Sequence, residues 1–557
     1  MSAFDHTKYR PFPQVQIKDR QWPDKTITQA PIWCSVDLRD GNQALIDPMT
    51  VEQKKRMFRL LVKLGFKQIE VGFPAASQPD FDFVRALIDE NMIPEDVTVQ
   101  VLTQAREHLI DRTIEALAGV KKAIVHIYNS TSKVQREQVF RMSRQEIIDI
   151  AVSGVRLVKE RVAKHPETQW RLEYSPESFT GTELDFAVEI CDAVVKEWQP
   201  TEENKIILNL PATVEMSTPN IFADQIEWFC RHIQQRNCIE VSLHTHNDRG
   251  CGVAAAELGL MAGADRVEGT LMGNGERTGN MDVITLAMNL YSQGVDPELN
   301  LANVEEIIQV VEDCTKIPVN PRHPYVGELV YTAFSGSHQD AIKKSLACQT
   351  PEEGWNVAYL PIDPKDLGCS YEAVIRINSQ SGKGGVAYVL ENDYGLQLPR
   401  WLQVEFAKKV QARTESLARE LQRKEVWETF EEAYLNNANK AELVSYKLER
   451  NGSDQLRAVV SQQGEEWQLQ ASGKGSLHAL SEALKDRLGS PVQITEYSEH
   501  ALTSGSEAKA CTYLQVQVGE ETFTGVAISE DTVSANLNAL LAAVSPALLA
   551  SKKAATA

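Results

Sequence analysis

The sequence predicts an α/β fold: a (β/α)8 TIM barrel, then a mixed linker region and a C-terminal module of two βββα repeats. Eight short β-like runs alternate with amphipathic helical stretches in the first half of the chain. Polar motifs follow several of these runs where a strand would end, which is where such barrels place an active site. From Glu442 onward, three strands and one helix occur twice in the same order.

The expected barrel strands are Ile32–Asp37, Gln68–Phe73, Val97–Leu102, Ala123–Tyr128, Arg171–Tyr174, Lys205–Leu210, Glu240–His244 and Arg266–Thr270. The expected helices between them include Val51–Leu64, Arg144–Ala163, Pro219–Gln235 and Gly250–Ala262. We expect an N-terminal arm at 1–30, the catalytic barrel at 31–295, linker subdomains at 296–435 and a regulatory domain at 436–557.

The linker region is expected to hold a helix at Val304–Thr315 and a charged helical run at Trp401–Asn437, whose alternating charges indicate a solvated face. The segment Ser379–Gly385 lacks the spacing of a phosphate-binding loop and predicts a plain turn.

The C-terminal module is expected to contain strands at Glu442–Glu449, Gln455–Ser461, Glu465–Gln470, Val492–Glu496, Ala510–Val518 and Glu521–Ile528, with helices at Ser476–Leu488 and Thr532–Val544. Each half is too small to bury its own helix face, so the halves should pack together. An effector site or a dimer interface is expected between them.

Composition excludes several classes of protein. The 557 residues are 43% hydrophobic and 24% charged, with a net charge of −20, which disfavours nucleic-acid and acidic-membrane partners. Nine dispersed cysteines without a Cys-x-x-Cys pair indicate reduced thiols and a cytoplasmic protein. Met1–Gln16 lacks the apolar segment of a secretory signal. Leu537–Ala550 is apolar but short and contains Pro546, which predicts a core helix rather than a membrane span.

Four side chains at strand ends are candidate metal ligands. His244 and His246 are two apart, so on a strand they point to the same face. With Asp40 and Asn280 they form a mixed oxygen and nitrogen donor set that suits Mg²⁺, Mn²⁺ or Zn²⁺. Taken singly, each motif has a simpler interpretation. The two histidines could be structural, Arg39-Asp40 could be a salt bridge in a turn, and Asn280 could be the N-cap of a helix. Their joint occurrence at strand ends favours a metal site.

Four protein ligands leave two octahedral positions, which the carboxylate and keto oxygens of a 2-oxo acid would fill. Arg39 would then stabilise negative charge on the keto oxygen, and Thr213 would hydrogen-bond the substrate carboxylate. His126, Ser175 and Glu177 also lie at expected strand ends. Glu276-Arg277 alone would be interpreted as a surface pair.

These motifs resemble a known family. Ser35–Leu45 is similar to the signature of the DRE-TIM metallolyase superfamily. Five further stretches resemble the longer type of 2-isopropylmalate synthase family: Leu243–Asp248, Gly269–Asn280, Phe334–Ile342, Tyr359–Gly368 and Ser379–Tyr388. The resemblance covers nearly the whole chain and is weaker in the C-terminal module.

The resemblance implies a transferase that condenses acetyl-CoA with 3-methyl-2-oxobutanoate, the first committed step of leucine biosynthesis. It implies the same four metal ligands, with Mg²⁺ favoured over Mn²⁺ or Zn²⁺, and K⁺ as a candidate activator. Arg39 would stabilise the alkoxide. His126, Ser175, Glu177 and Thr213 would bind the oxo acid.

The resemblance also implies a homodimer in which His338 reaches the partner's active site near Glu276. We expect Glu276 to orient His338, which would act directly or through water as the base for the acetyl methyl group. The alternative is that His338 only contacts the partner subunit.

The C-terminal module resembles a leucine-binding regulatory domain, with Gly473, Gly475 and Ala527 as candidate effector residues. The chain has Ala471-Ser472-Gly473-Lys474-Gly475-Ser476 where the family tends to have Gly-x-Gly-Asn-Gly-Pro. Close approach of an effector to the backbone is easiest at glycine, and Ala471 and Ala527 would crowd it slightly.

Three other functions compete with this interpretation. A sibling synthase would use pyruvate (citramalate synthase) or 2-oxoglutarate (homocitrate synthase), and the second carboxylate of 2-oxoglutarate would need an extra cation. A metal-dependent acyl-CoA lyase would lack the βββα module. A catalytically silent sensor would not need Glu276, His338 and an intact ligand set.

Overall fold

The computed structural model describes residues 5–333, 335–350, 354–369, 383–417, 421–436, 439–450, 452–502 and 508–556. The chain forms two compact units. One is Met1–Val330 with Pro364–Cys369, and the other is Tyr331–Asp363 with Ser370–Ala557.

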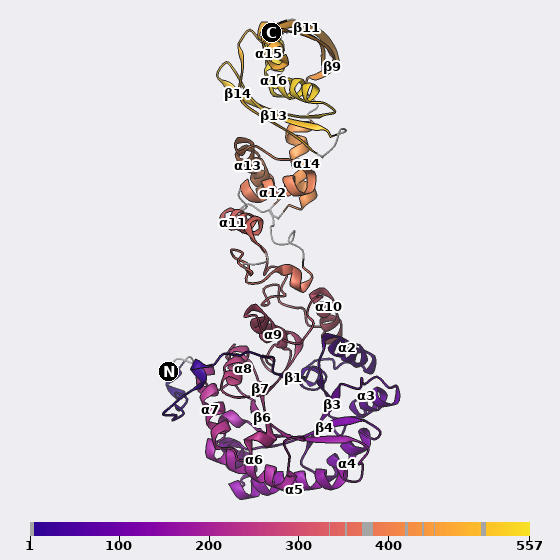
Figure 1. Cartoon of the computed structure of the whole chain (residues 1–557), viewed down its shortest axis with the longest axis vertical. Helices are drawn as coiled ribbons and strands as arrows, with labels where there is room; N and C mark the ends of the chain where they lie inside the picture. The colour runs from indigo at the N-terminus through magenta and orange to yellow at the C-terminus, as the bar shows by residue number, and fades with distance from the viewer. Residues whose placement is uncertain are drawn as a thin grey trace. The chain divides into compact units, whose positions relative to one another are not determined.

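Eight parallel strands of the first unit form a closed barrel in chain order, β1 to β8 (Figure 1). The strands are β1 Ile32–Ser35, β2 Gln68–Gly72, β3 Thr98–Gln104, β4 Lys122–Ser130, β5 Gln169–Glu177, β6 Ile206–Ala212, β7 Ile239–Thr245 and β8 Arg266–Gly269. β8 closes the barrel on β1, with pairs from Ile32 and Arg266 to Ser35 and Gly269. The predicted barrel is therefore confirmed.

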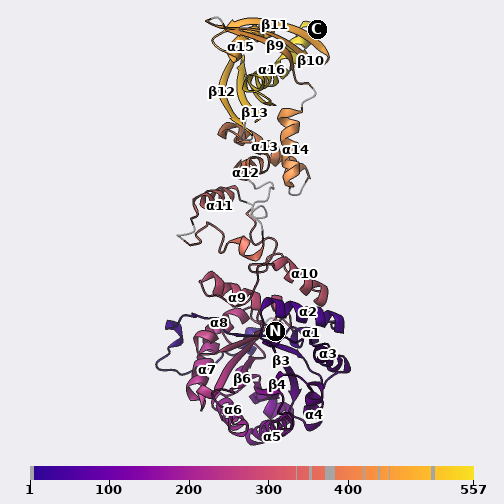
Figure 2. The same cartoon turned by 45° about the vertical axis from the view of Figure 1, so that its right-hand side comes forward.

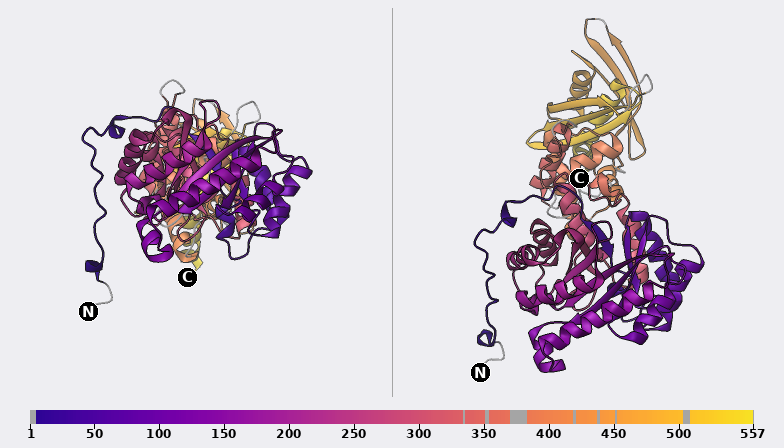
Figure 3. Two further views of the ribbon diagram at one scale, coloured as in Figure 1. Left: turned by 90° about the horizontal axis from the view of Figure 1, so that it is seen from below. Right: turned by 60° about the horizontal axis from the view of Figure 1, so that its bottom comes forward.

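Helices cover the outside of these strands (Figures 2 and 3). They are α2 Val51–Leu64, α3 Gln78–Asp89, α4 Glu107–Ala116, α5 Arg144–Val162, α6 Leu184–Trp198, α7 Pro219–His232, α8 Gly252–Met261 and α9 Val283–Ser292, with α10 Val304–Thr315 after them. A one-turn helix, α1 Asp40–Gln43, follows β1.

Local sequence fixes several helix starts. Thr50 and Gln53 form a capping box at the start of α2, and Ser143 and Glu146 form another at α5. Gly65 ends α2 in the left-handed conformation, with φ of 105°.

The predicted boundaries were least accurate at the carboxyl ends of strands. β5 was expected to end at Tyr174 but continues to Glu177, because Ser175–Glu177 pair in register with Tyr128–Ser130 of β4. The extension depends on the neighbouring strand, which a single run of sequence does not contain. Ser175 and Glu177 therefore lie on a strand.

The second unit begins with helices α11 Gly336–Cys348, α12 Lys383–Tyr394, α13 Arg400–Leu417 and α14 Arg423–Phe430. The expected single run Trp401–Asn437 is wrong, because a capping box of Gln422 and Glu425 starts a new helix. The expected turn Ser379–Gly385 lies partly outside the described residues, which exclude 379–382. Its last three residues, 383–385, are the first residues of α12. Phe334 and Asn437 also lie outside them.

The C-terminal module has two antiparallel sheets, ordered β11-β10-β9 and β12-β13-β14. Its strands and helices are β9 Glu442–Arg450, β10 Asp454–Gln462, β11 Glu465–Gly473, α15 Ser476–Leu488, β12 Val492–Ala501, β13 Ala510–Val518, β14 Glu521–Ser529 and α16 Thr532–Thr556. Residues of both halves share one hydrophobic cluster, including Leu484 and Leu540. The predicted repeat is confirmed.

One helical segment in the described part of the chain, Thr532–Lys552, is long and apolar enough to cross a membrane by length and composition alone. Half of its most apolar window is buried, and Leu537, Leu541 and Val544 are fully buried in the module. This burial agrees with the predicted core helix.

Candidate metal centre

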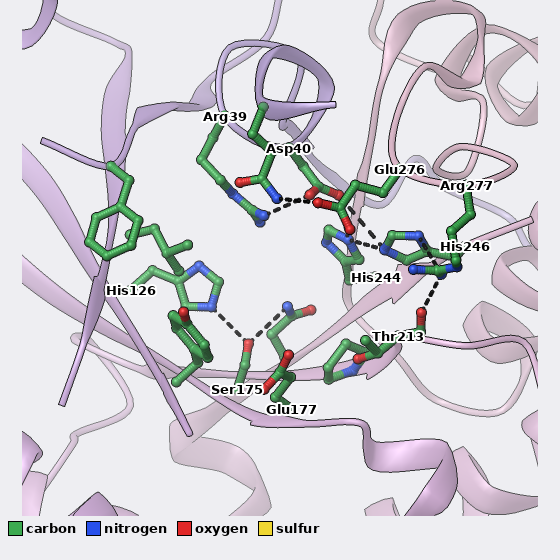
Figure 4. Close-up of a pocket in the computed structure, with 16 residues that line it drawn as sticks. Arg39, Asp40, His126, Ser175, Glu177, Thr213, His244, His246, Glu276 and Arg277 are labelled. Atoms are coloured by element: carbon green, nitrogen blue, oxygen red, sulfur yellow. Dashed lines mark hydrogen bonds and ion pairs between the residues drawn. The ribbon is translucent and has the colours of Figure 1, made fainter. Parts of the chain in front are cut away.

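A cavity of ≈ 230 Å³ lies at the carboxyl ends of the barrel strands (Figure 4). The structure brings together there nearly all the site residues predicted within the barrel. Its lining includes Arg39, Asp40, His126, Ser175, Glu177, Thr213, His244, His246 and Glu276.

The side chains of Asp40, His244 and His246 converge on one point. Asp40 opens α1, His244 lies on β7, and His246 follows that strand. Their candidate ligand atoms all lie within 4.8 Å of one another. Asp40 Oδ2 is 3.3 Å from His244 Nε2 and 3.7 Å from His246 Nε2, and the two Nε2 atoms are 3.2 Å apart.

Asp40 Oδ2 at this point, and Asn280 Oδ1 in the segment paired with His246, are buried oxygens with no hydrogen-bond partner among the described residues. An unpaired buried acceptor is costly, and coordination of a cation would satisfy both. The donor set of one carboxylate, two imidazoles and one amide oxygen therefore fits a divalent metal ion.

The three titratable candidate ligands influence one another strongly. Burial alone would raise the pKa of the Asp40 carboxyl, but Arg39 and the imidazoles hold it well below its usual range. Burial would lower the pKa of His244, but Asp40 and Glu268 raise it to about 9. Burial and the neighbouring His244 lower the pKa of His246 to about 3.

The loop after β8 places the backbone of Asn280 beside His246. Asn280 pairs with His246 in an isolated antiparallel bridge, and its Nδ2 donates to Asn274 O at 3.0 Å. Gly279 has a φ of +96°, and a Cβ there would lie 1.9 Å from Gly273 O, so the loop requires glycine. The N-cap of α9 is Asp282, so the N-cap interpretation of Asn280 does not hold.

Arg39 lies beside the ligands in a fixed position. Its Nη1 is 2.9 Å from Asp40 Oδ1, and its Nε donates to Glu70. The Arg39 side chain is 11% exposed. A guanidinium held between two carboxylates is ready to receive a third negative charge without rearranging.

His126, Ser175 and Asn209 form a hydrogen-bonded cavity floor. His126 Nδ1 is 2.8 Å from Glu70 Oε2, so the carboxylate places the ring proton on Nδ1. Ser175 Oγ then donates to His126 Nε2 at 2.7 Å and accepts from Asn209 Nδ2 at 3.1 Å. These polar groups satisfy one another.

Thr213 and Glu276 present polar atoms toward the cavity. Thr213 Oγ1 accepts from the Ser178 backbone N–H at 2.9 Å, which leaves its hydroxyl proton for a ligand. Glu276 accepts from Gln43 Nε2 at 3.2 Å, while Arg277 pairs with Asp248 at 2.7 Å. The surface pair that Glu276-Arg277 alone would suggest is therefore not formed. Glu177 accepts from Ser130.

His338 belongs to the second unit, on α11. Its ring stacks on Tyr359, with centroids 4.0 Å apart. Its predicted role at a barrel of the partner subunit stays a prediction.

Comparison with known proteins identifies the family. Residues 30–311 match the HMGL-like family model, 328–391 the alpha-isopropylmalate synthase post-catalytic domain-like model, and 420–548 the LeuA allosteric (dimerisation) domain model. The chain is 55% identical to 2-isopropylmalate synthases of Pseudomonas entomophila (97% of both chains) and Rhodospirillum rubrum (96% of this chain, 98% of the relative). The chain belongs to the 2-isopropylmalate synthase family.

A Parafrankia relative of the same name is also 55% identical over 97% of both chains. Among solved structures, an HMG-CoA lyase from Acenitobacter baumannii matches 53% of this chain and 94% of its own, with 18% identity and a TM-score of 0.42. The predicted family, enzyme class and regulatory module are thus confirmed, and a divalent metal is implied by the family.

The effector residues expected from the 2-isopropylmalate synthase family lie in the module. Gly473 ends β11, and a Cβ there would lie 2.4 Å from Ala479 N, so α15 starts directly against it. Gly475 is the N-cap of α15. Ala527 is 2% exposed on β14. Their role in leucine binding stays a prediction.

Sequence reasoning missed the polar residues inside the barrel beneath the centre: Gln68, Glu70, Gln100, Glu173, Asn209, Arg266 and Glu268, each at most 8% exposed. Glu70 and Glu268 contact Arg39 and His244, respectively. Burial would raise the pKa of Glu268, but Arg266 and His244 hold it well below its usual range. The usable signal was polar residues two apart, as in Gln68-x-Glu70 and Arg266-x-Glu268, within otherwise apolar strands.

Proposed function

We propose that this chain condenses acetyl-CoA with 3-methyl-2-oxobutanoate to give 2-isopropylmalate and coenzyme A, and that the residues of the barrel cavity carry out the reaction. The observation that carries this proposal is the convergence of Asp40, His244 and His246 beside Arg39. In addition, Asp40 Oδ2 and Asn280 Oδ1 are buried without a hydrogen bond. Membership of the 2-isopropylmalate synthase family supports the choice of substrates.

Asp40, His244, His246 and Asn280 would hold the divalent metal. Their donor set accommodates Mg²⁺, Mn²⁺ or Zn²⁺, and we favour Mg²⁺, with K⁺ as a further activator. When bound, the metal polarises the carbonyl of the oxo acid as a Lewis acid.

Arg39 and Thr213 act on the oxo acid. As the new carbon–carbon bond forms, the keto oxygen gains negative charge, which the preorganised Arg39 guanidinium stabilises. The free Thr213 hydroxyl proton is available to the substrate carboxylate, because Oγ1 already accepts from the backbone of Ser178. This contact would fix the orientation of the keto carbon.

A base must remove one proton from the acetyl methyl group. His126 already donates to Glu70 and accepts from Ser175, and His244 and His246 are ligands. We assign the base to His338 of a second copy of the chain, oriented by Glu276, as the resemblance of Phe334–Ile342 to the family implies.

The electrons of the broken C–H bond form the bond from the methyl carbon to the keto carbon. The resulting alkoxide takes up a proton. Water then cleaves the thioester C–S bond, which yields a carboxylate and the coenzyme A thiol.

The cavity favours an oxo acid with a branched apolar side chain. Phe73, Leu102 and Pro211 supply apolar lining, while the polar floor at Ser175 is internally hydrogen-bonded. Arg277 is paired with Asp248. Apart from Arg39, which is assigned to the keto oxygen, the described lining thus offers no unpaired arginine or lysine for the second carboxylate of 2-oxoglutarate.

Assembly and regulation complete the proposal. The match to an allosteric dimerisation domain supports a homodimer under effector control. We propose leucine as the effector, bound near Gly473, Gly475 and Ala527, and the cytoplasm as the location.

Coenzyme A release tests the proposal. Purified protein is stripped of metal, given acetyl-CoA with 3-methyl-2-oxobutanoate, pyruvate or 2-oxoglutarate, and assayed before and after Mg²⁺ or Mn²⁺ is added. We expect metal-dependent release that strongly prefers 3-methyl-2-oxobutanoate. Metal-independent release, or none with any oxo acid, would contradict the proposal.

A further inference from the structure

Glu268 lies directly beneath the metal centre, on β8, and is 1% exposed. Four donors converge on its carboxylate. Oε2 is 2.8 Å from His244 Nδ1 and 3.1 Å from Asn209 Nδ2. Oε1 is 2.9 Å from Arg266 Nη1 and 3.0 Å from Gln100 Nε2. The carboxylate is therefore fixed by donors on both of its oxygens.

This arrangement decides which nitrogen of His244 is available to a cation. A carboxylate accepts only, so the contact with Glu268 keeps a ring proton on Nδ1, and Nε2, which faces Asp40 and His246, is the nitrogen that would give up its proton to bind a metal. The nearest charged neighbour of His246 Nδ1 is different, because Arg277 Nη2 lies 3.2 Å from it. Of the two imidazoles, His244 is the one that also contacts a buried carboxylate other than that of Asp40.

We propose that Glu268 is a positioning residue of the metal centre: it fixes the tautomer and orientation of His244 and, through Asn209, links this ligand to the Ser175 floor of the substrate cavity. Carboxylates that accept from a ligating imidazole typically raise metal affinity 10–100-fold. The inference rests on the proposed metal site.

Glu173 offers a matched control. It is also fully buried, and its Oε2 lies 3.3 Å from the same Arg266 Nη1. Its other neighbours include Glu268 itself and His126 Nε2, which lies 3.4 Å from Oε1, and none of them is a proposed metal ligand. Glu173→Gln and Glu268→Gln thus alter the same buried core, but only the second reaches His244.

The substitution Glu268→Gln is informative because an amide has a single acceptor oxygen. Four donors converge on this position, so the glutamine oxygen can serve His244 and Asn209, or Arg266 and Gln100, but not both pairs. The remaining NH₂ group would then face donors. In the Glu268→Gln variant, His244 Nδ1 would therefore lack a fixed acceptor.

The test is Mn²⁺ affinity of the metal-stripped full chain, measured by calorimetry together with the thermal midpoint. We expect Glu268→Gln to weaken Mn²⁺ binding roughly 10–100-fold and Glu173→Gln to change it less than about threefold. Equal affinities for the native chain and Glu268→Gln would overturn the inference. His244→Ala separates the two hypotheses: if it still binds Mn²⁺ normally, the metal site itself is wrong.

Glu268→Gln could unfold the chain by leaving Arg266 short of a partner. In that event Arg266→Gln is compared with the double variant Arg266→Gln/Glu268→Gln, which removes both charges. A further loss of about 10-fold or more in Mn²⁺ affinity in the double variant supports the inference, and no further loss overturns it.

Discussion

His246 and Asn280 pair across an isolated antiparallel bridge, which ties the end of β7 to the loop after β8. The bridge places the backbone of Asn280, whose Oδ1 is buried without a hydrogen bond, beside that of the proposed ligand His246. The proposed metal centre thus draws on segments that are far apart in the sequence, and this bridge joins two of them.

The first prediction concerns the glycine that shapes this loop. Gly279→Ala should weaken Mn²⁺ binding at least ~10-fold, because the new Cβ would strike Gly273 O and displace Asn280. Gly294→Ala is the matched control: it also has a positive φ, but nothing lies within 4 Å of its Cβ. Calorimetric titration of both variants checks this. Equal affinities would show that the loop tolerates the methyl group.

Removal of the proposed fourth ligand gives a second prediction. Asn280→Ala should reduce Mn²⁺ affinity, though less than His244→Ala, because one neutral amide oxygen is lost rather than an imidazole. Affinity for Mn²⁺ and its pH dependence would be measured for both. If Asn280→Ala binds as tightly as the native chain, the amide oxygen is not a ligand.

The third prediction concerns the substrate carboxylate. Thr213→Val removes the free hydroxyl proton and should raise the KM for the oxo acid about 10-fold or more, as expected for a hydrogen bond to a charged group. The KM for acetyl-CoA should stay unchanged. Thr213→Ser keeps the hydroxyl and should restore the native KM. An equal rise in both KM values would indicate a general disturbance of the cavity.

A mixed-dimer experiment tests the proposed base. His338→Ala and Asp40→Asn should each be inactive, since one lacks the base and the other a metal ligand. If His338 serves the partner's barrel, each mixed dimer contains one intact site, and an equal mixture regains up to about a quarter of native activity. Mixed dimers that form but stay inactive would contradict a base supplied across the subunits.

Feedback control gives the fifth prediction. Leucine should inhibit coenzyme A release by the native chain, and Gly473→Ala should weaken that inhibition, because the new Cβ would displace the start of α15 at Ala479. Gly489→Ala, at the other end of α15 with open space at its Cβ, is the control. Unaltered activity of the native chain in excess leucine would reject this prediction.

The strands and helices were predictable because the spacing of apolar residues differs between a strand and a helix. Boundaries were harder, as β5 shows: Ser175–Glu177 extend the strand because β4 pairs with them. Similarly, Gln422 and Glu425 start a new helix within what looked like one charged run.

The metal ligands were predictable because His244-x-His246 places two imidazoles on one strand face. Glu70 and Glu268 were not predicted, because a strand's sequence does not show which polar side chains face the barrel interior or what they meet there. Glu268 reaches His244 only through the pairing of β7 with β8. The proposed position of His338 in the active site of a partner subunit likewise cannot be predicted from the spacing of residues along the chain.

A competition experiment tests the central claim most directly. The Mg²⁺-loaded enzyme would receive limiting acetyl-CoA labelled with ¹³C in its methyl group, together with equal concentrations of 3-methyl-2-oxobutanoate, pyruvate and 2-oxoglutarate. Mass spectrometry would then quantify each condensation product. We predict that labelled 2-isopropylmalate dominates. Predominant labelled citramalate or homocitrate, or labelled acetate alone, would contradict the assignment of substrate and reaction to this cavity.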